Sequence, residues 1–237
     1  MKYVYQFGNG MAEGTAEMKN LLGGKGANLA EMNLLGIPVP AGFTITTEVC
    51  TYYYDNNCEF PNELNSQILE SIKATEKIMG AKFGDNQNPL LMSVRSGARK
   101  SMPGMMETVL NVGLTSKTIP ALIKKTNNPR FVYDAYRRLI MMYADVVMEK
   151  SNGIEINSEH GIRHKLESLL TEYKNKNNYI NDTDLNENDW KLLSNRFKEE
   201  IKTSMGIEFP DDPMEQLMGG VKAVFQSWHG KPAQRIS

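Results

Sequence analysis

The chain has 237 residues, of which 41% are hydrophobic and 23% charged, as in a globular protein with a buried core. Its 27 lysines and arginines nearly balance its 28 aspartates and glutamates, and no segment carries a sustained basic run. No apolar run approaches the roughly 18 residues that span a bilayer, and Cys50 and Cys58 provide neither a disulfide framework nor metal spacing. We therefore expect a cytoplasmic protein with no nucleic-acid or membrane partner and no metal site in this chain.

A glycine-rich segment lies near the start of the chain. Residues 21–32 read Leu-Leu-Gly-Gly-Lys-Gly-Ala-Asn-Leu-Ala-Glu-Met, and their periodicity predicts a helix that begins near Gly26 or Ala27 and is closed by Gly36. The N–H groups at such a helix start, with the charge of Lys25 beside them, favour a phosphate. The spacing is not that of a Walker loop. Alone, the segment is more typical of a plain turn ahead of a packing helix.

A second segment, residues 93–108, combines small and basic side chains: Ser-Val-Arg-Ser-Gly-Ala-Arg-Lys-Ser-Met-Pro-Gly-Met-Met-Glu-Thr. It follows Leu90-Leu91-Met92, a short apolar run that we interpret as a buried strand. Arg95 can bind a phosphate through two parallel hydrogen bonds, which a lysine cannot do. By composition alone, a basic surface loop between two strands explains the segment equally well.

The remaining pattern alternates strands and helices. Alternation predicts strands near residues 3–7, 43–45 and 108–112, and helices are predicted from Thr46 or Thr47, from Pro61 to Gly80, after Asn127-Asn128-Pro129, and from Asp212-Pro213. For the long helix after Pro129 we expect an apolar stripe, widened by further apolar residues, with three arginines off it on the solvated surface. The stripe is Phe131, Ala135, Met142 and Val146; the widening residues are Tyr136, Leu139, Ile140 and Tyr143; the arginines are Arg130, Arg137 and Arg138.

Residues 154–210 are polar and helical, with an Asn- and Lys-rich connection at 174–188, and we interpret them as a small inserted subdomain. The expected division is a lobe at 1–150, a helical insert at 151–210 and a helix at 211–237. Aspartates and asparagines at 182–188 imitate the start of a calcium loop but lack its Gly and final Glu, so they predict a helix entrance. His160 and His164 are expected in solvent, because Gly161 weakens the helix that a shared metal site would need.

The two segments that could bind a phosphate closely resemble segments of the pyruvate, phosphate dikinase family. In that family Val-Arg-Ser-Gly-Ala-Arg and Met-Pro-Gly-Met-Met occur in one piece, as they do here at residues 94–106. Gly-Gly-Lys-Gly-Ala-Asn-Leu-Ala-Glu-Met resembles the opening of the same family and of the phosphoenolpyruvate synthases. Asn-Pro-Arg-Phe followed by Tyr-Arg-Arg also matches, and the resemblance extends from Phe7 to Trp228.

This resemblance implies an α+β fold: an ATP-grasp-type front lobe, with a mixed sheet and flanking helices, that carries the helical insert. The family makes phosphoenolpyruvate from ATP, phosphate and pyruvate through a phosphohistidine on a central domain, which is a partner absent from this chain. By analogy Lys25, Arg95 and Arg138 hold the triphosphate, and Lys25 and Arg95 act in catalysis. Gly104, Met105 and Met106 would line the pocket. ATP is expected with Mg²⁺, whose ligands belong to a missing second lobe, and the longer enzyme is expected to be a homo-oligomer.

The departures from the family pattern leave alternatives open. The family's enzymes are several times longer, and residues 229–237 do not continue its usual sequence, so we expect a truncated chain or a disrupted reading frame that is inactive in the full reaction. A phosphoenolpyruvate synthase-like dikinase is a second reading, which Gly97-Ala98-Arg99 and Met102 to Met106 disfavour. A third is a non-catalytic fragment that binds a nucleotide or anion on its own.

Overall fold

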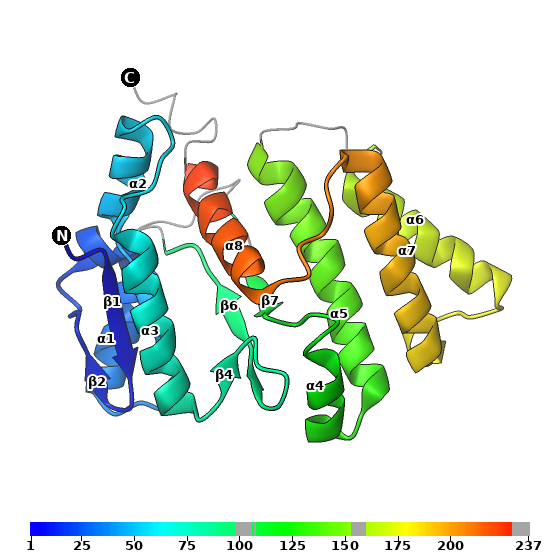
Figure 1. The fold of residues 1–237 in the computed structure, drawn as a ribbon, viewed down its shortest axis with the longest axis horizontal. Coiled ribbons are helices and arrows are strands. Elements are labelled where there is room, and N and C mark those ends of the chain that lie inside the picture. The colour runs from blue at the N-terminus through cyan, green and yellow to red at the C-terminus, as the bar shows by residue number, and fades with distance from the viewer. Residues whose placement is uncertain (98–105, 107, 153–159, 229–237) are drawn as a thin grey trace. The chain divides into compact units, whose positions relative to one another are not determined.

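The computed structural model describes residues 1–97, 106, 108–152 and 160–228. Within them the chain forms two compact units: the first contains residues 1–83 with Ser96 and Gly97, and the second contains residues 84–95 and the described residues from Met106 onward. Helices and short strands occur together, which confirms the α+β class (Figure 1). These units divide the chain at other positions than the expected boundaries at 150 and 210. Among the described residues, no helix is long and apolar enough to cross a bilayer.

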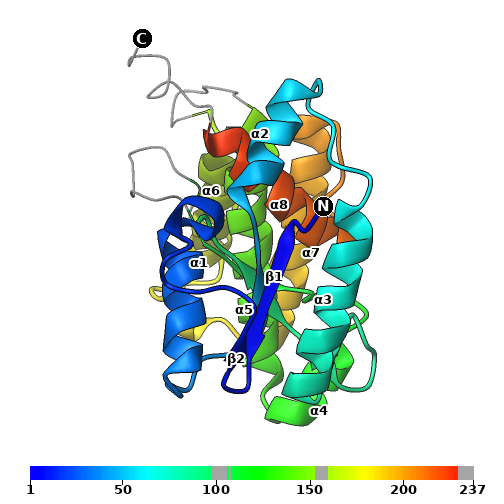
Figure 2. The same ribbon diagram turned by 90° about the vertical axis from the view of Figure 1, so that its left-hand side faces the viewer.

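The first unit is built on a three-stranded antiparallel sheet in the order β2-β1-β3. Its elements are β1 (Val4–Gly8), β2 (Met11–Ala12), α1 (Lys19–Leu34), β3 (Gly42–Ile45), α2 (Thr47–Asp55), α3 (Leu64–Met79) and β4 (Lys82–Phe83). In the β1–β3 pairing Val4 lies opposite Ile45. Figure 2 shows α1 and α3 on either side of β1, and both helices contact the sheet. Helix α2 begins at Thr47 and α3 ends before Gly80, as predicted.

The second unit is mainly helical. Its elements are β5 (Pro89–Leu90), β6 (Met92–Val94), β7 (Val109–Val112), α4 (Ile119–Thr126), α5 (Pro129–Tyr143), a π-helical turn η1 (Ala144–Glu149), the 3₁₀ turns η2 (Lys150–Asn152) and η3 (Asp182–Asp184), α6 (Ile162–Lys176), α7 (Glu187–Met205) and α8 (Pro213–Trp228). Strands β6 and β7 pair antiparallel, so the basic segment connects two neighbouring strands. Helix α8 packs on them, with Gly220 against Val94.

Strand β7 differs from the expected alternation. Val109 and Val112 are both fully buried, although they lie three residues apart, and Leu110 is 51% exposed. The reason is local: Asn111 has φ +60°, a left-handed conformation that turns the strand between the two valines. Such a kink cannot be read from hydrophobic periodicity.

Helix α5 begins as predicted, with the Asn128 side chain accepting a hydrogen bond from the Phe131 N–H and Pro129 at the first position. The expected main stripe is wrong at Phe131, which is 58% exposed, whereas Val146 is buried as predicted and Ala135 and Met142 are half-buried. The residues expected only to widen the stripe form the core: Tyr136, Leu139, Ile140 and Tyr143 are all nearly inaccessible. The helix is covered by α4, α7 and β7 on different sides, so no single apolar face defines its packing.

Helices α6 and α7 form an antiparallel pair, and α7 lies alongside α5 over much of its length (Figure 1). The core of this contact includes Trp190, Leu193 and Phe197, all fully buried. Two capping boxes, at Asn181 and Asn186, start η3 and α7. The Asp- and Asn-rich stretch is therefore a helix entrance, as predicted.

Candidate functional site

Within the first unit, the glycine-rich turn and the basic segment meet backbone to backbone. Gly23 interrupts α1 with φ +71° and ψ +170°, which separates Lys19–Leu22 from the rest of the helix. A Cβ atom at Gly23 would lie only 1.8 Å from the carbonyl oxygen of Gly97, so only glycine permits this approach. The helix resumes directly after Gly23, slightly earlier than the predicted start near Gly26 or Ala27. The two segments that the sequence singles out therefore contact each other.

Lys25 lies in the first turn of the resumed helix, and its side chain is exposed. The turn is held against the sheet by Gly26, where a Cβ atom would lie 2.7 Å from the Cγ2 atom of Thr44 on β3. The Gly97 backbone on one side and the Thr44 side chain on the other leave room only for glycine at these two positions. The positive end of the resumed helix and the adjacent ammonium group would favour an anion.

Arg95 follows directly after β6 in the second unit, and its side chain is exposed. No ion pair joins it to another of the described residues. Met106, near the other end of the same connection, is buried, with 9% of its surface exposed. Gly104 and Met105, the other expected pocket residues, lie outside the described residues.

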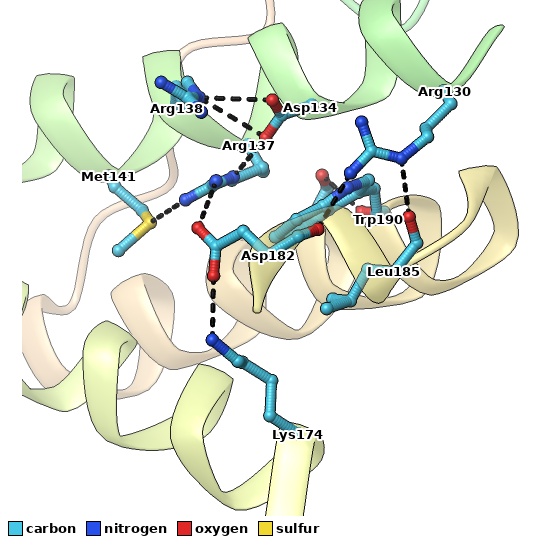
Figure 3. Close-up of polar contacts among 10 residues, drawn as sticks. Arg130, Asp134, Arg137, Arg138, Met141, Lys174, Asp182, Leu185 and Trp190 are labelled. Carbon is cyan, nitrogen blue, oxygen red and sulfur yellow. Dashed lines mark hydrogen bonds and ion pairs between the residues drawn. The ribbon is translucent and has the colours of Figure 1, made fainter. Parts of the chain in front are cut away.

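Arg138 is 63% exposed on α5, as predicted, but it is not isolated. Its Nε atom lies 3.3 Å from each carboxylate oxygen of Asp134, one helical turn earlier. Asp134 is only 17% exposed and also accepts a hydrogen bond of 2.7 Å from Nε of Arg137. Two arginines therefore share one carboxylate (Figure 3).

The prediction that Arg137 lies on the solvated surface is wrong. Arg137 is 6% exposed, its guanidinium carbon lies 4.2 Å from the centre of the Trp190 ring, and its Nη2 atom pairs with Asp182 at 2.9 Å. Lys174 binds the other oxygen of Asp182 at 3.0 Å. Figure 3 shows that these contacts join α5 to α6, η3 and α7. One sequence signal could have indicated that Arg137 is paired: Asp134 precedes it by three residues and so lies on the same side of the helix.

Arg130, the third arginine expected on the surface, also binds this connection. Its Nε donates to the carbonyl oxygen of Leu185 at 2.6 Å, and its Nη2 donates to that of Asp182 at 2.8 Å. Both acceptors lie in the connection between α6 and α7, and the Asp182 carbonyl also accepts from the Leu185 N–H at 3.3 Å. Burial alone would raise the pKa of Asp182, but the hydrogen bond from Lys174 and the charge of Arg137 lower this pKa overall.

In the described part of the chain, no three histidine, cysteine or acidic side chains are grouped as metal ligands would be. His160 and His164 are exposed, as expected. The predicted phosphate-binding residues Lys25, Arg95 and Arg138 are all cationic and exposed. Their chemistry suits the phosphates of a nucleotide more than a bare metal ion.

Comparison with known proteins identifies the family. The model of the pyruvate phosphate dikinase AMP/ATP-binding domain matches residues 19–66 and 56–234, nearly the whole chain. The chain belongs to this family. It is 51% identical over 228 residues to the pyruvate, phosphate dikinase of Clostridium symbiosum and 47% identical over 228 residues to that of Rhizobium meliloti, in each case over 96% of this chain. It is 44% identical over 234 residues to pyruvate, phosphate dikinase 1, chloroplastic, of Zea mays, over 99% of the chain.

The chain spans about a quarter of the length of these relatives: 24% of the two bacterial proteins and 23% of the maize protein. Membership therefore identifies an AMP/ATP-binding domain of the pyruvate phosphate dikinase family. The resemblance stated from the sequence is confirmed at the level of the family. Nothing in these comparisons assigns roles to individual residues of this chain.

Proposed function

We propose that the chain binds ATP for a pyruvate, phosphate dikinase, and that Lys25, Arg95 and Arg138 bind the phosphates. The observation that carries this proposal is the contact between Gly23 and Gly97, which joins the glycine-rich turn to the basic segment. Glycine has no side chain, so this approach brings two backbone segments together directly. Backbone N–H groups at a helix start, with a lysine beside them, are a usual means of binding a phosphate.

In this proposal Arg95 stabilises the charge of the phosphoryl group in transfer, and Lys25 neutralises the phosphates at the helix start. Met106 supports the pocket wall, together with Gly104 and Met105. ATP binds as its magnesium complex, whose carboxylate ligands come from outside this chain. The fold is of the ATP-grasp type, residues 151–210 are its helical insert, and the phosphate passes to a histidine on another domain of the longer enzyme.

The test uses a dikinase of full family length that contains this chain. Arg95→Ala is expected to lower the rate of phosphoenolpyruvate formation by at least about a hundredfold, about 3 kcal/mol, because a transition-state contact is lost. Arg163→Ala is the control, since Arg163 is an exposed arginine paired with Glu167 on α6. Wild-type rates in the Arg95 variant would refute the assignment.

A further inference from the structure

The contacts recorded for Arg138 use one of its five N–H donors. Its recorded contacts within the described residues use only Nε, which faces the two oxygens of Asp134. A guanidinium group presents two forks, and an anchor at Nε leaves the pair of terminal nitrogens directed away from the carboxylate. That pair is the fork that binds a phosphate end-on.

An exposed arginine is otherwise a poorly ordered ligand. Arg138 is 63% exposed, and a side chain of this length loses rotamer freedom when it is fixed on a ligand. Asp134 is itself held in place, because it is 17% exposed and is bound by the buried Arg137 at 2.7 Å. A fixed carboxylate can therefore restrict Arg138 before any ligand arrives.

A carboxylate beside a phosphate site would normally oppose binding, since it repels the ligand and cancels the arginine's charge. Here the charge of Asp134 is already compensated by Arg137. Arg137, Asp134, Arg138, Asp182 and Lys174, which we call the α5 charge cluster, are joined by ion pairs of 2.7–3.3 Å (Figure 3). Its three cations and two carboxylates leave one net positive charge, and the only strongly exposed cation among them is Arg138.

We propose that Asp134 is a positioning residue that pre-orients Arg138 for a phosphate group of the nucleotide. The buried Arg137 neutralises the charge of Asp134, so that Asp134 orients Arg138 without cancelling its positive charge. This inference rests on the proposed role of Arg138 in phosphate binding. Helix α5 then carries both Arg138 and the two residues, Asp134 and Arg137, that orient it. The α6–α7 pair also has a part in the site, because Asp182 and Trp190 hold Arg137 in place.

The first test is calorimetric titration of the chain with magnesium ATP. Asp134→Ala is expected to weaken binding about fivefold, the cost of ordering one long side chain at the moment of binding. Asp134→Asn is expected to lose less affinity for magnesium ATP, because the asparagine amide oxygen can still accept hydrogen bonds from Nε of Arg137 and Arg138. Glu167→Ala is the matched control, since Glu167 pairs with Arg163 at 2.9 Å on α6, and it is expected to leave affinity unchanged.

The decisive comparison repeats Asp134→Ala in an Arg138→Ala background. If Asp134 acts through Arg138, its removal has no further effect there. An equal loss in both backgrounds would overturn the positioning role, because Asp134 would then act through the fold. Unchanged affinity in Arg138→Ala alone, or no binding by the folded wild-type chain, would overturn the proposed phosphate role and this inference with it.

A second measurement needs no nucleotide. The Nε–H group of Arg138 is expected to give an ordered NMR signal in the wild-type chain and a mobile one in Asp134→Ala, with the signals of the core amides unchanged. Equal mobility in both proteins would contradict pre-orientation, whatever the ATP titration shows.

Discussion

At the scale of single residues, the site depends on positions that carry no charge as well as on those that do. Gly23 admits the carbonyl group of Gly97, and Gly26 admits the side chain of Thr44. The nearby charged residues can contribute to phosphate binding only when these contacts hold the backbone in the right conformation. The glycine-rich turn could be found in the sequence, but its partner could not, because some 70 residues separate the two segments.

Gly23→Ala tests this contact directly, and Gly36→Ala is its matched control. Both glycines have a positive φ, +71° and +77°, so both variants incur backbone strain of about 1–3 kcal/mol, and the ψ of +170° at Gly23 adds to it because that region is essentially restricted to glycine. Gly36 has no atom within 4 Å of an added Cβ, whereas Gly23 has the Gly97 oxygen at 1.8 Å. Urea unfolding is expected to show an additional loss of about 2 kcal/mol for Gly23→Ala. Equal losses would mean that the contact is not formed in solution.

Arg137 presents the opposite case, a charge that the fold has buried. Arg137→Met preserves much of the apolar packing on Trp190 but removes the ion pairs with Asp134 and Asp182. The expected loss of unfolding free energy is about 2 kcal/mol or more, because the half-buried Asp134 keeps only Arg138 as a partner. Lys202→Ala, at the exposed pair with Glu208, should shift the thermal midpoint far less. A stable Arg137→Met protein would show that the α5 charge cluster contributes little.

At the scale of elements, local signals predicted helix starts well and burial poorly. Asn128 with Pro129, and the Asn186 capping box, each start a helix through hydrogen bonds within four residues, which a sequence displays directly. The buried face of α5 depends on which helices surround it, so Phe131 was expected inside and lies outside. Arg137 was missed for the same reason: its partners Asp182 and Trp190 follow it by more than forty residues.

The connection between α6 and α7 is expected to respond to acid. Asp182 has a lowered pKa in the folded chain, so it adds stability above its unfolded value near 4 and loses that contribution as the pH falls through the lower folded value. Thermal midpoints compared at pH 5.5 and pH 3 should therefore fall more in the wild type than in Asp182→Asn. Solvent screens this half-exposed group, so the difference should be modest. Parallel curves for the two proteins would contradict the ion pairs seen here.

At the scale of the whole molecule, the family could be inferred from two continuous segments because their residue order is specific. The two compact units could not be inferred, since the basic segment passes from one unit to the other between Arg95 and Ser96. A sequence pattern marks helices and strands but not where contacts between distant segments become dense. The chain spans about a quarter of its relatives' length, so its own contribution is best measured as binding of nucleotide.

The most direct test of this account is calorimetric titration of the 237-residue chain with magnesium ATP, with Lys25→Ala and Lys19→Ala in parallel. Both lysines lie in α1, but Lys19 precedes the interruption at Gly23 and Lys25 follows it. The account predicts that the wild type and Lys19→Ala bind alike and that Lys25→Ala binds about tenfold more weakly, the loss of one charge-assisted contact. Equal affinity in all three proteins, or no binding by a folded chain, would contradict it.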